Sequence, residues 1–130
     1  MLRFLIAALG IGLILGAGGL YAHGQQATEI YIPIGQSPGL SGKITFIGRI
    51  ETINPGDRSL RVVGPSGTAS AVVTDRTKIW LDRGKLRLSN TTGGFADLRR
   101  GLMVEIKYEG SERKSQGAAE WIKVQVEASS

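Results

Sequence analysis

The sequence predicts an all-β domain that follows an N-terminal export segment. Apolar and polar residues alternate with a period of two in several separate stretches after Lys43, which is typical of half-buried strands. Short turns rich in glycine, proline and asparagine separate these stretches. The chain has no cysteine, so no disulfide stabilises the domain and its stability depends on an apolar core.

Residues 1–24 have the composition of an export signal. Arg3 precedes an apolar run from Phe4 to Ala22, about 19 residues, which is close to the roughly 20 that span a bilayer as a helix. Glycines interrupt the run, and Ala22-His23-Gly24 supplies small residues for cleavage before Gln25. The segment is either a cleaved signal peptide or an inner-membrane anchor formed by residues 4–22. Both alternatives predict a periplasmic or secreted domain.

The remaining chain has about 106 residues, enough for one domain and too few for two. Its formal net charge falls from +5 to +4 without Arg3, and acidic residues are interspersed among the basic ones. A mixed surface of this kind is typical of a solvated protein, while the positive balance leaves an anionic partner open. The lack of cysteine excludes thiol redox chemistry and cysteine-ligated metals.

Residues 25–42 are expected to form a tether, because the stretch from Gly35 to Gly42 is dense in glycine, proline and serine. Within the tether, residues 30–34 are apolar enough to dock as a short edge strand, where Pro33 is tolerated. We expect this stretch to dock on its own domain. The alternative is an exposed strand that binds a partner protein through Ile30, Tyr31, Ile32 and Ile34.

Three strands joined by hairpins begin the domain. One face of the first strand, at 43–53, carries Ile44, Phe46, Gly48 and Ile50, whereas Ile47 and Ile53 are out of phase. The turn at 54–57, in which Gly56 is free to adopt a left-handed conformation, leads to a strand at 58–63. A second turn leads to a strand at 68–74, which completes an antiparallel meander.

The second half of the domain is predicted from less regular patterns. A short apolar piece at 78–82 precedes a polar loop, and one helical turn at 95–101 ends at Gly101. Two clearly alternating strands follow, at 102–109 and 121–127. The predicted order is three strands, then a connection with a short helix, and then two more strands. This is the order of a five-stranded OB-type barrel, which we place at 43–127. Closure of such a barrel removes exposed strand edges.

Three stretches of sequence support this fold in a second way. They are Gly42–Glu51 with the turn Asn54–Asp57, then Val72–Ile79, and then Phe95–Leu98 leading into Gly101–Ile106. Together they resemble a group of small exported bacterial OB-fold-like domains of unknown function, over most of the mature chain. The resemblance implies the fold and export, and it transfers no functional residues.

Two better understood exported OB families are incompatible with the sequence. Haem chaperones of cytochrome maturation attach haem through a histidine in the domain, and the only histidine here is His23, in the export segment. Periplasmic copper carriers use histidine and methionine ligands, and beyond Met1 the only methionine is Met103.

No catalytic constellation is apparent. Without a histidine in the domain, a base for serine or threonine would have to be a carboxylate or a lysine. Asp75, Asp82 and Asp97 are expected in turns or at a cap, and Asn90-Thr91-Thr92 is interpreted as a turn although it matches a glycosylation sequon. We therefore expect a non-enzymatic domain without a metal or cofactor.

The strongest indication of a binding site comes from the two tryptophans of the chain. Trp80 and Trp121 are out of phase with the apolar residues beside them, so they point away from the core face. Exposed tryptophans near Lys78, Arg83, Lys107 and Lys123 would form a stacking platform for an oligosaccharide or nucleic acid. Alternatively, each tryptophan covers a barrel end or packs against the tether as a second small core.

The sequence thus predicts an exported binding or interaction module of the periplasm or cell envelope. One alternative is an accessory subunit that docks in an envelope complex through residues 30–34 as an added strand. The other is a binder of an anionic polymer, whose affinity would fall with salt. The partner and the oligomeric state stay open.

Overall fold

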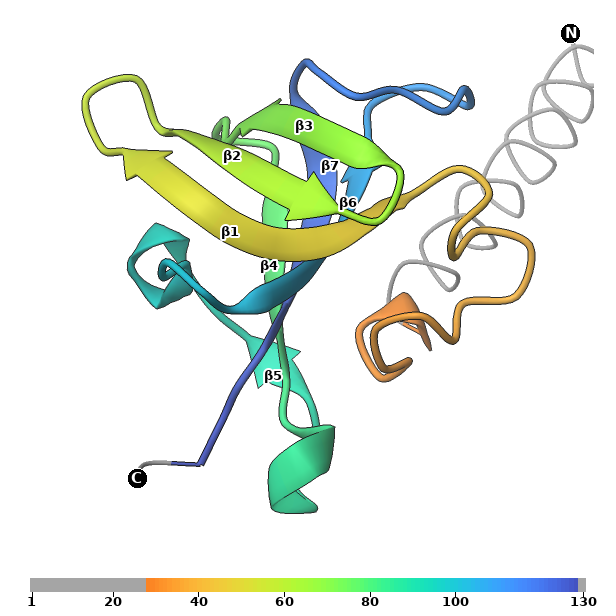
Figure 1. Cartoon of the computed structure of the whole chain (residues 1–130). Coiled ribbons are helices and arrows are strands. Elements are labelled where there is room, and N and C mark those ends of the chain that lie inside the picture. The colour runs from red at the N-terminus through yellow and green to blue at the C-terminus, as the bar shows by residue number, and fades with distance from the viewer. Residues whose placement is uncertain (1–27, 129–130) are drawn as a thin grey trace, which may run out of the picture.

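The alternating stretches form seven strands, which pair into one mixed sheet in the computed structural model (Figure 1). The structure describes residues 28–128, so the predicted export segment at 1–24 lies outside the described residues. The strands are β1 (Phe46–Asn54), β2 (Ser59–Gly64), β3 (Gly67–Val72), β4 (Lys78–Asp82), β5 (Thr91–Thr92), β6 (Met103–Tyr108) and β7 (Ala119–Gln125). Two short 3₁₀ helices, η1 (Gly84–Leu86) and η2 (Phe95–Asp97), lie between β4 and β6. Within residues 28–128, no helix has the length and apolar character needed to cross a bilayer.

Strands β1, β2 and β3 form the predicted antiparallel meander. The pairing of β1 with β2 shifts register between Ile50 and Thr52. This bulge explains why Ile53 is out of phase in the sequence, because an extra residue turns the following side chains to the opposite face. Ile53 consequently packs against the same core as Ile50.

The other half of the sheet continues from β1 through β6, β7 and β4 to β5. β6 pairs antiparallel with β1 and with β7, whereas β4 and β7 run parallel. β5 is a two-residue strand that pairs with β4 through Thr91 and Thr92. These two threonines were expected in a turn, because asparagine and glycine flank them and two residues give no detectable alternation.

The sheet bends so that β1–β3 lie across β4, β6 and β7, and the apolar core fills the space between the two halves (Figure 1). Buried side chains from both halves include Leu60, Val62, Ile106 and Ile122. Complete burial of each aliphatic side chain contributes about 1.5–3 kcal/mol. The core therefore stabilises a domain that has no disulfide.

The predicted five-stranded closed barrel is wrong, although the all-β class is confirmed. The sheet has seven strands in an open order that runs from β3 to β5. β3 approaches the chain before β7 through two backbone hydrogen bonds, from Ser70 N to Ser115 O at 2.8 Å and from Val72 N to Gly117 O at 2.9 Å, with one parallel bridge between Val72 and Ala118. One isolated bridge is too short to make a strand ladder, so the sheet does not close.

Two turn positions also differ from expectation. The turn between β1 and β2 forms as predicted, with Gly56 N donating to Asn54 Oδ1 at 3.0 Å. Its left-handed residue, however, is Arg58 with φ of 54°, and Gly56 does not have a positive φ. The helical turn expected at 95–101 is shorter and ends at Asp97, whose carboxylate accepts from Gly94 N at 2.8 Å. Asp97 thus has the cap role expected of it.

Candidate functional site

Strands β4, β6 and β7 present polar and aromatic residues on the face that points away from the core. Strand alternation directs Ile79, Ile106 and Ile122 into the core and their neighbours to the opposite side. We call this opposite side the outer face and define it by Trp80, Asp82, Glu105, Trp121 and Lys123. All five are buried, which is unusual for charged residues on the outside of a small sheet.

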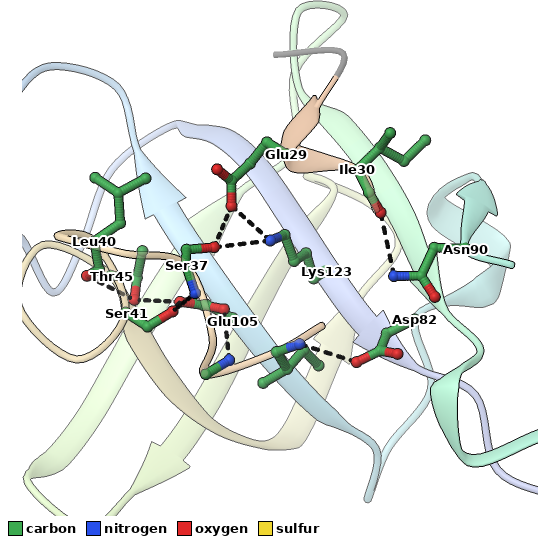
Figure 2. A network of polar contacts seen from close by, with 12 residues as sticks. Glu29, Ile30, Ser37, Leu40, Ser41, Thr45, Asp82, Asn90, Glu105 and Lys123 are labelled. Atoms are coloured by element: carbon green, nitrogen blue, oxygen red, sulfur yellow. Dashed lines mark hydrogen bonds and ion pairs between the residues drawn. The ribbon is translucent and has the colours of Figure 1, made fainter. Parts of the chain in front are cut away.

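The outer face is covered by residues 28–45, which we call the strap (Figure 2). The strap begins with two tight turns, closed by bonds from Tyr31 N to Thr28 O and from Ile32 N to Glu29 O, both 3.1 Å. Three glycines with positive φ, at Gly35, Gly39 and Gly42, let it change direction before it enters β1. Residues 28–45 thus follow the surface of their own domain.

An ion pair joins the beginning of the strap to β7. Lys123 Nζ lies 2.7 Å from Glu29 Oε1, and the two side chains are 1% and 14% exposed. The Ser37 hydroxyl accepts from Lys123 Nζ at 3.0 Å and donates to Glu29. The ammonium also lies 4.7 Å from the centre of the Trp121 ring. A buried ammonium requires such partners, because an unpaired buried charge costs several kcal/mol.

A second carboxylate holds the middle and the end of the strap. Glu105, on β6, is fully buried and accepts from Gly35 N at 3.0 Å, Ser41 Oγ at 2.6 Å and Thr45 Oγ1 at 2.7 Å. All three donors are uncharged. Hydrogen bonds to an ionised acceptor are stronger than bonds between neutral groups, so this carboxylate fixes the strap along much of its length.

Two further side chains bind the main chain of the strap. Asp82 Oδ2 accepts from Ile34 N at 2.9 Å, and its Oδ1 accepts from Gly84 N at 2.9 Å. Asn90 Nδ2 donates to Ile30 O at 3.2 Å, while its Oδ1 accepts from Arg83 N at 2.8 Å. The strap is therefore held by side chains of three strands and of the loop before β5 (Figure 2).

The two tryptophans point away from the core, as their phase predicts, but the expectation that they are exposed is wrong. Trp80 and Trp121 are 5% and 3% exposed, and their ring centres are 5.4 Å apart. Both lie on the face that the strap crosses. Their burial favours the alternative prediction of a second small core under the tether, and Lys123, which pairs with Glu29 of the strap, lies 4.7 Å from the centre of the Trp121 ring.

The four basic residues expected beside the tryptophans have different surroundings. Lys123 contacts Trp121, and Lys78 and Lys107 flank Trp121 in the strand register. Lys107 pairs with Glu120 at 3.2 Å. Arg83 turns to its own loop, where Nε donates to Ser89 O at 2.7 Å. With the strap in place, these residues do not form an open aromatic surface.

The strap residues proposed to bind a partner lie against their own domain. Ile30, Ile32 and Ile34 are half-buried, and Tyr31 is 66% exposed. Residues 30–34 form turns and do not make the expected edge strand, because their polar groups bond to side chains of the outer face and not to a strand edge. Docking on the same domain, which we expected, is confirmed.

Sequence reasoning missed most of the polar residues of the site. Glu105 and Lys123 both fall on the outward phase of long strands, and this pattern is the signal that directs them to one face. Glu29, Ser37 and Asn90 carry no comparable signal, because turn-rich segments have no periodicity.

All buried polar side-chain atoms of the described part have a hydrogen-bond partner. In the same part of the chain, no group of three or more histidine, aspartate or glutamate residues is arranged to hold a metal ion. The side chains of the outer face, together with Asn90, hold a peptide segment through charged, amide and hydroxyl groups.

Comparison of the chain with protein-family models, with characterised proteins and with solved structures gives no match. The resemblance to exported OB-fold-like domains therefore stays a prediction from the sequence.

Proposed function

We propose that this chain is an exported, non-enzymatic interaction module of the cell envelope. The observation that supports this most directly is the outer face, whose charged groups all serve to hold a polypeptide segment. Glu105 and Asp82 accept main-chain N–H groups, and Lys123 pairs with a carboxylate. A face with these properties is suited to recognition of a protein.

The fixed strap also bears on where the domain acts. If residues 4–22 are a retained anchor, only residues 23–27 separate the anchor from Thr28. At about 3.3–3.6 Å per extended residue, these keep the domain within roughly 20 Å of the bilayer. If the segment is cleaved, the same domain acts free in the periplasm or outside the cell.

Binding of an anionic polymer is the second candidate, and one observation favours it. Two carboxylates, Asp82 and Glu105, are buried against one ammonium, Lys123, so the exposed surface is more basic than the composition indicates by one charge. Arg49 and Lys85 share the single carboxylate of Glu127, at 4.0 and 3.8 Å. Arg49 Nη1 also donates to Gly101 O at 3.0 Å, directly beside Arg99 and Arg100. This basic surface is open, unlike the tryptophan face.

The test is affinity capture from envelope extract with the full chain in detergent, washed first at low and then at high salt. The bound material is identified, and binding is repeated with purified components by calorimetry. A protein that stays bound at high salt and binds with a defined stoichiometry supports the interaction module. Nucleic acid or glycan released by salt supports the second candidate. Turnover of a captured small molecule would contradict both.

A further inference from the structure

We propose that the outer face is a peptide-binding face that the strap occupies in cis, and that its partner is an acidic peptide segment of another protein. The partner segment takes the place of the strap. This inference deepens the proposed function and rests on it, since it names the surface and the chemistry of the partner.

Recognition of the main chain is the first argument. The amides of the neighbouring residues Ile34 and Gly35 donate to Asp82 and Glu105, which come from different strands. The carbonyl of Ile30 accepts from Asn90. These three bonds involve backbone groups that almost every peptide offers, so a partner segment need not share the strap's side chains there, although the positive φ of Gly35 favours glycine at that position.

Selection of an acidic side chain is the second argument. Lys123 is 1% exposed, and the structure gives its ammonium one anionic partner, Glu29, in addition to the Ser37 hydroxyl. A segment that replaces the strap without a carboxylate at this position would leave a buried ammonium unpaired. Because that is costly, the face discriminates in favour of aspartate or glutamate.

The third argument is that the strap can leave without breaking the sheet. No residue of the strap before β1 pairs in a strand ladder, so its docking depends on side-chain contacts. Gly39 and Gly42 have φ of 75°, and a Cβ at either position would meet no atom within 4 Å. These two residues lie in the hydrogen-bonded turns that connect residues 28–38 to β1, so residues 28–38 can leave the outer face while Ser41 and Thr45 keep their bonds to Glu105.

The tryptophans provide a direct readout of occupancy. The whole chain has two tryptophans, and both lie on the outer face. Departure of the strap would expose Trp80 and Trp121 to water, which shifts their emission to the red and increases quenching by acrylamide. Filling of the face by another peptide would reverse both changes.

The experiment compares the full chain with its Glu29→Ala variant. Glu51→Ala is the matched control, because it removes a glutamate from an exposed ion pair with Arg61. In Glu29→Ala, loss of the buried pair should lower the docked population about tenfold or more, and acrylamide quenching should rise. Glu51→Ala should leave quenching unchanged. Far-UV circular dichroism verifies that the sheet of each variant is intact.

A synthetic peptide of residues 28–45 is then added to Glu29→Ala at concentrations up to about 1 mM. A segment tethered by a short linker has an effective concentration in this range, so the free peptide has to reach it in order to compete. The proposal expects this peptide to restore the protected emission, and the same peptide with Glu29→Ala to fail. An acidic peptide of the captured partner should act like the first peptide.

Three results would overturn the proposal. One is protected tryptophans in a folded Glu29→Ala variant. Another is no restoration by the peptide although the variant is folded and quenched. The third is a concentration-dependent dimer of the wild-type chain, which would make a second copy the occupant. None of these results affects partner capture by the full chain, so failure of this inference is distinguishable from failure of the proposed function.

Discussion

Lys123 of β7 and Glu29 of the strap are 94 positions apart in the chain, yet Lys123 Nζ lies 2.7 Å from Glu29 Oε1. This pair joins the first described turn of the chain to its last strand. Because the lysine is fully buried, the pair links the stability of the domain to docking of the strap.

We expect Glu29→Ala and Lys123→Met each to lower the free energy of unfolding by on the order of 3 kcal/mol, since each leaves one charge of a buried pair without its partner. The double variant leaves neither charge behind. Its loss should therefore be well below the sum of the single losses, as measured by urea denaturation. Additive effects would show that the two side chains are not energetically coupled.

Glu105→Gln tests the carboxylate that holds Gly35, Ser41 and Thr45. An uncharged amide accepts more weakly and presents its own N–H groups to these donors. The free energy of unfolding should fall by about 1–3 kcal/mol, as it does when a buried hydrogen-bonding group loses its partners. The matched control is Glu109→Gln, whose side chain is 40% exposed and which should change stability by less than about 0.5 kcal/mol. Equal effects of the two variants would contradict a special role for Glu105.

Burial raises the pKa of Tyr108 from 10.0 to about 12. Its hydroxyl donates to Ser70 O at 2.8 Å, across the core. The folded state therefore favours the neutral phenol, and this contribution to stability is complete below pH 10 and is lost as the pH rises towards 12. The loss amounts to about 2–3 kcal/mol and is measured by urea denaturation in alkaline buffers.

Tyr108→Phe is the control for this pH dependence. It should be less stable than the wild type at neutral pH by about 1 kcal/mol, because Ser70 O loses its donor. Between pH 10 and 12 the free energy of unfolding of Tyr108→Phe should also fall by less than that of the wild type, since phenylalanine does not ionise. A wild type and variant with parallel pH profiles would contradict the assignment.

Gly48 allows β1 and β2 to approach closely. A Cβ at this position would lie 2.4 Å from the backbone oxygen of Val63, so one of the strands would have to move. Gly48→Ala should cost about 1–3 kcal/mol and lower the melting temperature. Gly94→Ala is the matched control, because the position has open space and an extended backbone with φ of −140°. A similar melting temperature for Gly48→Ala and the wild type would show that the sheet can adjust.

Much of the fold could be predicted because strand alternation is local. The long strands β6 and β7 lie close to their predicted ranges, whereas the bulge in β1, which accounts for the phase break at Ile53, was not predicted. Closure of the sheet could not be predicted. It depends on whether β3 forms a ladder with the chain before β7, and this contact involves residues far apart in the sequence.

The candidate site was predictable in part for the same reason. The sequence by itself determined that Trp80 and Trp121 point away from the core, because alternation sets the direction of a side chain on a strand. Only the tertiary structure decided that both are buried and that Lys123 pairs with Glu29. What covers a face and which charges meet there depend on a segment without periodicity, whose path is set by distant side chains.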